Sequence, residues 1–248
     1  MGRRPKGPLP DSPPGAGLPV IGGVWLLKER AYHVLREAIL RLDLKPGEPL
    51  TERALSERLG VSKSPIRDAL IRLEQEGLAR SSPFRGFEVA RLTEADMRNV
   101  FRFREAMELY SVEAFIEQGP PAHLAEIEAT HAEQGHLLEA SDRVRAYEDS
   151  RFHQVLVGAL ENPIFTVVAR AIQAQVRRIQ NLASTIPGRL EKTHQEHDRI
   201  LQAIRARDVG TSREAMRRHI RSVLEDTLAS DQLRRVTAAS GSPPTGRP

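Results

Sequence analysis

The sequence predicts a mainly α protein with two parts: an N-terminal winged helix-turn-helix with a small β wing, and a C-terminal six-helix all-α bundle. Residues 44–78 hold two short helical patterns joined by a Gly-containing turn, which is typical of a helix-turn-helix. Residues 79–91 hold two short strand-like runs around a turn. From residue 93 onward the apolar spacing is helical, with Pro or Gly between most segments.

The composition allows two modest domains and excludes several classes of protein. The chain has 248 residues, 40% of them hydrophobic, and no cysteine, which excludes disulfide frameworks and thiolate metal sites. No apolar run approaches the ~20 residues of a membrane span. Pro and Gly interrupt the basic N-terminus, unlike a secretory signal. We therefore expect a cytoplasmic protein with no membrane partner.

Positive charge is concentrated in the N-terminal part of the chain. Residues 1–91 hold 16 Lys and Arg against 11 Asp and Glu, a net charge of +5. Residues 92–248 hold 21 against 22, a net charge of −1. Contact with DNA phosphates needs an excess of this sign, so the charge favours the N-terminal part as the one that binds nucleic acid.

Four regions follow from these patterns. Residues 1–24, with six prolines and six glycines, are expected to be a disordered arm. Residues 25–92 form the winged helix-turn-helix DNA-binding domain, which opens with a helix from Trp25 to Leu42. Residues 93–233 form an all-helical domain, and residues 234–248 a disordered tail.

Helix-capping signals support the helix-turn-helix. Thr51 stands where an N-cap is needed, and Gly60 can end that helix in the left-handed conformation. Ser62 or Ser64 can cap the next helix, which Gly77 ends about a dozen residues later. The predicted wing then follows, with Arg85 at its tip.

The outward face of the second helix has the chemistry of a groove reader. Lys and Arg can reach guanine O6 and N7 in the major groove, while serine hydroxyls suit phosphates. The bland alternative is a small helical subdomain with solvated charges, but caps, apolar spacing and basic face all agree on DNA. The residues on this face are Ser62, Lys63, Ser64, Arg67 and Arg72.

These residues carry a family resemblance. Residues 29–91, with LKPGEPLTERALSERLGVSKSPIRDALIRLEQEGL and RGFEV, resemble the DNA-binding domain of the GntR family of bacterial transcription regulators. The resemblance implies DNA contacts from an arginine of the first helix of the motif, the start of the recognition helix, and the wing tip. Lys63 stands where the family usually has arginine, and lysine offers a point charge rather than a bidentate fork. The implied DNA-binding residues are Arg53, Ser62, Lys63, Ser64, Arg67, Arg85 and Gly86.

Six helices are expected in the second domain. The first starts at a capping-box-like Thr93–Asp96 and ends near Gln118. Antiparallel packing of such helices through short loops makes a bundle. The other five are expected at His123–Glu139, Ser141–Leu160, Ile164–Ala183, Arg189–Arg207, and from Thr211 or Ser212 to Leu233.

Several polar side chains lie on the apolar faces of these helices. Asp149 and His153 are four residues apart and therefore neighbours, while His197 and His219 lie on the stripes of later helices. Each alone fits an ordinary buried side chain, but the four together favour a divalent metal held by nitrogen and oxygen, with zinc first and nickel or manganese as alternatives. His194 could substitute for His197. We expect the remaining histidines to be solvated: His33, His123, His131 and His136.

Arg104 lies on the apolar stripe of the first bundle helix, whereas Arg102 points to the opposite side. A buried arginine must be paired. Glu108, one helical turn on, is the ordinary partner, and an anionic ligand is the alternative.

Residues 93–229 resemble the FCD ligand-binding domain of the FadR branch of the GntR family through FRFREAME, DSRFH, EHDRILQAI and MRRHI. The resemblance implies that Asp149, His153, His197 and His219 hold the metal. It also implies that Arg104 binds an organic-acid effector.

The sequence therefore predicts a homodimeric regulator that represses a catabolic operon through a pseudopalindromic DNA operator and responds to a small carboxylate. One rival is a metal-dependent hydrolase, but no further side chain is clearly placed as a general base. The other is an architectural DNA-binding protein with an inert bundle, which the inward Arg and His residues argue against.

Overall fold

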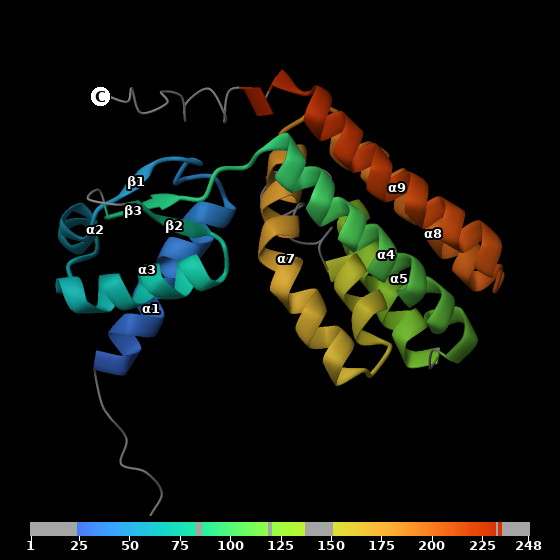
Figure 1. The fold of residues 1–248 in the computed structure, drawn as a ribbon. Helices are drawn as coiled ribbons and strands as arrows, with labels where there is room; N and C mark the ends of the chain where they lie inside the picture. The colour runs from blue at the N-terminus through green and yellow to red at the C-terminus, as the bar shows by residue number, and fades with distance from the viewer. Residues whose placement is uncertain (1–23, 83–85, 119–120, 137–150, 232, 235–248) are drawn as a thin grey trace, which may run out of the picture.

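The computed structural model describes residues 24–82, 86–118, 121–136, 151–231 and 233–234 (Figure 1). The predicted arm up to residue 23, the tail from residue 235, Arg85 and Asp149 lie outside these ranges. Within the described ranges, no helix combines the length and apolar character needed to cross a membrane.

The N-terminal module is a winged helix-turn-helix, as predicted. Its helices are α1 (Val24–Leu40), α2 (Glu52–Leu59) and α3 (Lys63–Gln75). The wing strands β2 (Ala79–Ser82) and β3 (Gly86–Val89) are antiparallel, and a short strand β1 (Pro49–Leu50) adds to β3. The sheet order is β1-β3-β2, so the wing has one strand more than the sequence indicated.

Local signals explain the turns of this module. The Thr51 side chain accepts a hydrogen bond from the backbone N–H of Ala54 and so caps α2. Gly60 ends α2 at φ 66°, a conformation that costs glycine little. Ser62 takes the N-cap place of α3, but its side chain makes no cap hydrogen bond. Its hydroxyl therefore does not serve the helix as the sequence suggested it could.

Arg72, which the sequence placed on the outward face of α3, is held against residues of α1. The Arg72 guanidinium carbon lies 3.6 Å from the centre of the Tyr32 ring. Its Nη1 donates to both carboxylate oxygens of Glu29, at 2.9 and 3.0 Å. Arg72 thus joins α3 to α1, because the aromatic face and the carboxylate together hold its cation.

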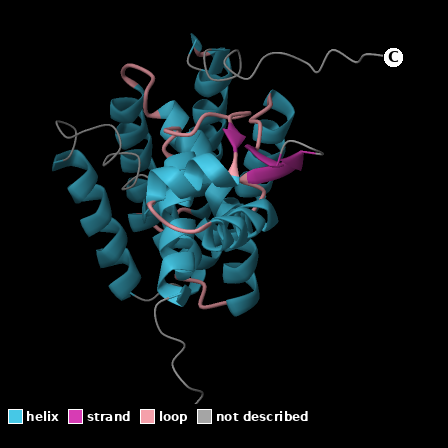
Figure 2. Cartoon of the chain, turned by 90° about the vertical axis from the view of Figure 1, so that its left-hand side faces the viewer, coloured by secondary structure: helices cyan, strands magenta, loops and turns pink. Residues whose placement is uncertain are grey.

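In the described residues of the C-terminal part, the regular elements are all helices (Figure 2). α9 packs along both α4 and α8, and their inward side chains share one hydrophobic cluster that begins at Leu92. The N-terminal module has a separate cluster, with Ile39, Ile66 and Leu70 fully buried. The elements are α4 (Glu94–Gln118), α5 (Pro121–His136), helical residues 151–158, α7 (Pro163–Ala183), α8 (Arg189–Arg205) and α9 (Val209–Ala229).

Two helix starts test the sequence analysis of this part. Asp96 N donates to Thr93 Oγ1 at 3.1 Å and Thr93 N donates to Asp96 Oδ2 at 3.2 Å, which is the expected reciprocal cap of α4. The start of α9 was expected near Thr211 or Ser212, which is slightly too late. The Asp208 side chain accepts from Thr211 N at 2.9 Å, so the helix begins two residues before Thr211, at Val209.

α7 lies between the N-terminal module and the other helices (Figure 1). Gln175 Nε2 donates to the Gly77 carbonyl at 2.8 Å, just beyond α3. Arg177 makes a bidentate pair with Glu37 of α1, at 2.9 and 3.0 Å. Asn181 Nδ2 donates to the Leu40 carbonyl at 2.6 Å. One side of α7 is therefore fixed to the module by polar contacts.

Candidate metal and ligand site

Three histidines meet at the centre of the helical domain. His153 comes from helical residues 151–158, His197 from α8 and His219 from α9. Their Nε2 atoms form a triangle with sides of 3.2 Å (His153 to His197), 3.2 Å (His153 to His219) and 3.4 Å (His197 to His219). All three residues are buried, so the nitrogens converge away from bulk solvent.

This triangle fits a divalent metal ion. An ion about 2.05 Å from each nitrogen would see them at angles of about 105°, close to the tetrahedral geometry of zinc. Burial lowers the pKa of His153 and lowers the pKa of His197 well below its usual value. Neutral imidazoles are the form that binds metals, so charge and geometry suit the same ligand.

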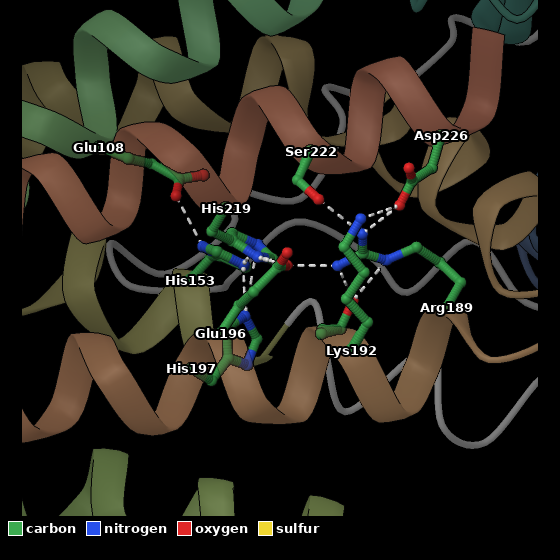
Figure 3. A network of polar contacts seen from close by, with 10 residues as sticks. Glu108, His153, Arg189, Lys192, Glu196, His197, His219, Ser222 and Asp226 are labelled. Carbon is green, nitrogen blue, oxygen red and sulfur yellow. Dashed lines mark hydrogen bonds and ion pairs between the residues drawn. The ribbon is translucent and has the colours of Figure 1, made fainter. Parts of the chain in front are cut away.

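Two buried glutamates orient the imidazoles (Figure 3). Glu108 Oε2 lies 2.6 Å from His153 Nδ1, and Glu196 Oε2 lies 2.9 Å from His219 Nδ1. An ionised carboxylate can only accept, so each Nδ1 must donate and each Nε2 keeps its lone pair. Carboxylates in this role fix ring orientation and raise ligand basicity. Sequence reasoning did not give either glutamate this role.

Each glutamate is held in turn by a buried arginine. Arg104 Nε donates to Glu108 Oε1 at 2.6 Å, and Arg189 Nη2 donates to Glu196 Oε2. We call Arg104–Glu108–His153 the Arg104 chain and Arg189–Glu196–His219 the Arg189 chain. Although burial alone would raise it, the charge of Arg104 and the hydrogen bond from His153 bring the pKa of Glu108 down to about 2.

Arg104 has donors left over. Its side chain is only 2% exposed, yet Nη1 and Nη2 find no hydrogen-bond partner within the described residues. Arg104, Glu108 and His153 all line a cavity of about 260 Å³. α7 forms another wall of this cavity, with apolar and amide side chains: Ile172, Gln173, Val176 and Gln180. The ordinary partner Glu108 is therefore present, and it uses only one of the three nitrogens.

The residues implied for DNA contact that the structure describes all lie exposed on the N-terminal module: Arg53, Ser62, Lys63, Ser64, Arg67 and Gly86. The Arg53 side chain is 82% exposed and the Arg67 side chain 69%. Their nearest carboxylates, Glu57 and Glu52, are 3.8 and 3.9 Å away. Such exposed pairs are weak, so both guanidinium groups can turn to phosphates or bases.

Comparison with known proteins agrees with both parts. Residues 27–89 match the profile described as bacterial regulatory proteins, gntR family, and residues 99–222 match the FCD domain. The chain belongs to the GntR family. GntR regulators bind DNA and typically act as dimers. The chain is accordingly a transcription regulator and not an enzyme, which sets the hydrolase alternative aside.

Relatives of this GntR chain have the same two parts. It is 34% identical over 199 residues to an uncharacterized HTH-type transcriptional regulator in an unstable DNA locus of Streptomyces ambofaciens, covering 79% of this chain and 82% of that one. It is 26% identical to the HTH-type transcriptional repressor RspR of Escherichia coli (strain K12), covering 80% and 88%. The solved structure of E. coli McbR/YncC aligns with a TM-score of 0.65 at 21% identity, covering 87% and 99%, which shows the shared fold.

A second cluster of histidines corrects one expectation. His131 was expected to be solvated, but it is 8% exposed and its Nε2 lies 2.7 Å from Asp198 Oδ1. His194, the possible substitute for His197, stacks on His131 at 4.2 Å between ring centres and 16° between planes. His131, His194 and Asp198 could also hold a metal, but the Asp198 side chain is 50% exposed, whereas all three histidines of the triangle are buried. In this GntR protein the convergent triangle is therefore the stronger candidate for a metal site.

Proposed function

We propose that this chain is a dimeric, metal-containing repressor that releases DNA when a small carboxylate binds beside the metal. The name of RspR supports repression as the sign of regulation. Zinc is the first choice of metal, because three histidine nitrogens at this spacing suit a tetrahedral ion. Asp149, four residues before His153, would supply the fourth ligand. It lies outside the described residues, so its role rests on the sequence.

The observation that carries the proposal is the cavity shared by Arg104 and His153. Two buried N–H donors of Arg104 without a partner cost free energy that a ligand can recover. A carboxylate is the group whose two oxygens fit a guanidinium fork. Further ligand oxygens can approach the metal, because His153 lines the same cavity. The amide groups of Gln173 and Gln180 suit hydroxyl or carbonyl groups on the rest of the acid.

We propose that the DNA face consists of Arg53, Ser62, Lys63, Ser64, Arg67, Arg85 and Gly86. The exposed start of α3 would enter the major groove, and the wing tip would lie against the neighbouring backbone. A two-fold dimer presents two such helices, so the operator would be a short pseudopalindrome. A catabolic operon whose substrate is the effector acid is the expected target.

The contacts of α7 support a route from the ligand to the DNA-binding module. Gln173 and Val176 line the cavity, whereas the intervening Gln175 and the next residue, Arg177, hold the Gly77 carbonyl and Glu37. A ligand that pulls the cavity wall inward would therefore move the surface on which the module docks. Operator affinity then falls if the ligand binds one arrangement better than the other.

Metal analysis of the purified protein, a thermal-shift screen of small acids, and operator titrations with and without a stabilising acid test this function. We expect a bound divalent metal, stabilisation by at least one carboxylate, and weaker operator binding in its presence. A metal-free protein that no acid stabilises would refute the proposed response to a ligand. If such a protein still bound specific DNA, the alternative of an architectural DNA-binding protein would remain.

Arg67→Ala tests the DNA face. If Arg67 reads a base, the substitution costs about 1–3 kcal/mol of operator affinity and relaxes sequence preference. Arg218→Ala removes the same charge from an exposed position on α9 and serves as the matched control. Equal affinity of Arg67→Ala and Arg218→Ala in a gel-shift titration would show that this face does not read the operator.

A further inference from the structure

Arg189 is a buried arginine with no part in the proposed ligand cavity. It starts α8, and its side chain is 1% exposed. Each of its three nitrogens donates a hydrogen bond. Nε donates to Thr193 Oγ1 at 3.1 Å. Nη1 donates to Ser222 Oγ at 2.9 Å and to Asp226 Oδ2 at 2.5 Å. Nη2 donates to Thr193 Oγ1 at 2.9 Å and also to Glu196 Oε2.

The contact with Glu196 connects Arg189 to the histidine triangle. One oxygen, Glu196 Oε2, accepts from both Arg189 Nη2 and His219 Nδ1 (Figure 3). Glu196 is 8% exposed and His219 is fully buried, so water cannot readily replace either partner. Arg189 also ties this oxygen to α9 through Ser222 and Asp226, on the helix that carries His219.

The orientation of Glu196 decides which nitrogen of His219 faces the triangle as an acceptor. While the carboxylate accepts from Nδ1, the proton resides there and Nε2 offers a lone pair. If Glu196 turned away, the tautomer protonated at Nε2 would become more populated. In that tautomer the Nε2 hydrogen points toward the centre of the triangle, so the nitrogen cannot bind a cation. The hydrogen bond from Arg189 is a second contact that holds this buried carboxylate in place.

We propose that Arg189 is a positioning residue of the metal centre: it holds Glu196 so that His219 presents its Nε2 lone pair. Arg189 contacts none of the three histidines, and in this role it acts on His219 through Glu196. The inference rests on the proposed metal function.

Metal affinity of purified full-length variants tests this role. Zn²⁺ affinity is measured by competition with a chromophoric chelator, and the visible spectrum of the Co²⁺ form reports ligand geometry. Arg189→Met should weaken Zn²⁺ binding by about 10- to 100-fold, the usual effect of losing a group that orients a metal ligand. Arg189→Lys keeps a cation beside Glu196 and should recover part of that loss.

Lys192→Met is the matched control. Lys192 contacts the same Asp226 at 2.7 Å, but no described contact joins it to Glu196. This variant removes one cation from the same network and should bind Zn²⁺ as the wild type does. If Arg189 were only structural, Arg189→Met would lower the unfolding free energy of the metal-free protein yet bind Zn²⁺ like Lys192→Met, and the inference would be overturned.

A double-substitution cycle keeps the test decisive even if Arg189→Met folds poorly. Glu196→Gln is combined with Arg189→Lys, and the Kd for Zn²⁺ is measured for both single variants and the pair. If Arg189 acts through Glu196, the pair should be no worse than Glu196→Gln alone. Additive losses would overturn the inference. Failure of the wild type to bind any divalent metal would instead refute the proposed function.

Discussion

The Arg104 chain and the Arg189 chain have the same order of residues but differ in how many arginine nitrogens are hydrogen-bonded. In each, a buried arginine holds a glutamate on its own helix, and the glutamate accepts from a histidine Nδ1. Arg189 places all three nitrogens in hydrogen bonds within the protein, whereas among the described residues Arg104 finds a partner only for Nε. Two chains that converge on one triangle thus differ in the donors they leave open.

This difference suits the Arg189 chain to supporting a histidine and the Arg104 chain to binding a ligand. A fully bonded buried arginine has little to gain from a ligand, so the Arg189 chain can hold one histidine still. Two open donors in a cavity cost about 1–3 kcal/mol each until something accepts from them. The Phe101 ring, 5.3 Å from the Arg104 guanidinium carbon, offers only weak compensation. The open donors of the Arg104 chain therefore belong to a residue that lines the cavity in which we propose that a carboxylate binds.

Removing His197, the corner of the triangle that belongs to neither chain, should have the largest effect. His197→Ala deletes one Nε2 of the triangle, so bound metal should be lost. At a metal concentration of 100 times the wild-type Kd, the wild type should gain about 2.7 kcal/mol of unfolding free energy and the variant almost none. Denaturant titrations with and without Zn²⁺ measure this.

His194→Ala is the matched control for that experiment, because His194 stacks on His131 outside the triangle. It should keep its metal, as shown by elemental analysis. Full metal occupancy in His197→Ala, or loss of metal in His194→Ala, would reverse the assignment of ligands.

The next effect separates the two arginines. Arg104→Ala would remove the cation beside Glu108 and so disturb His153. Its effect on metal binding could then not be separated from its effect on ligand binding. Arg104→Lys keeps a cation and removes the planar fork, so metal binding should change little. Affinity for the stabilising acid should fall about 10- to 100-fold, since a charge-assisted hydrogen bond contributes about 1.5–3 kcal/mol.

Calorimetric titration of the acid into metal-loaded protein provides the readout. Arg102→Ala, at an exposed position two residues before Arg104, should bind the acid normally. An unchanged affinity in Arg104→Lys would mean that the open donors serve no ligand.

Much of the fold, and the histidine at the end of each chain, could be predicted from the sequence. Caps at Thr51 and Thr93 are local, and His153, His197 and His219 lie on apolar stripes that the helical period exposes. Glu196 gave no such signal, because it stands beside His197, about 100° around the helix. Its pairing with His219 joins α8 to α9, and periodicity within one helix carries no information about contacts between helices.

Arg189 was missed for a related reason. A basic residue next to a Gly at a helix start resembles a solvated loop cation, and only the approach of Ser222 and Asp226 from α9 buries it. Arg104 was found because it interrupts an apolar stripe in the middle of a helix. The sequence could thus identify the open chain and not the saturated one, since saturation comes from residues far away along the chain.

The smallest expected effect lies at the outer end of the Arg189 chain. Asp226 accepts from Arg189 Nη1 and from Lys192, and its side chain is 33% exposed. Asp226→Asn leaves Arg189 with Thr193, Ser222 and Glu196, so the carboxylate beside His219 should keep its place. Because Asp226 is partly exposed and Arg189 keeps Glu196 as a counter-ion, the unfolding free energy should fall by no more than about 1 kcal/mol. Zn²⁺ affinity should stay close to that of the wild type, measured in the same chelator competition as the Arg189 variants. If Asp226→Asn lost as much Zn²⁺ affinity as Arg189→Met, the whole hydrogen-bond network around Arg189 would control Zn²⁺ affinity, rather than the one bond from Arg189 to Glu196.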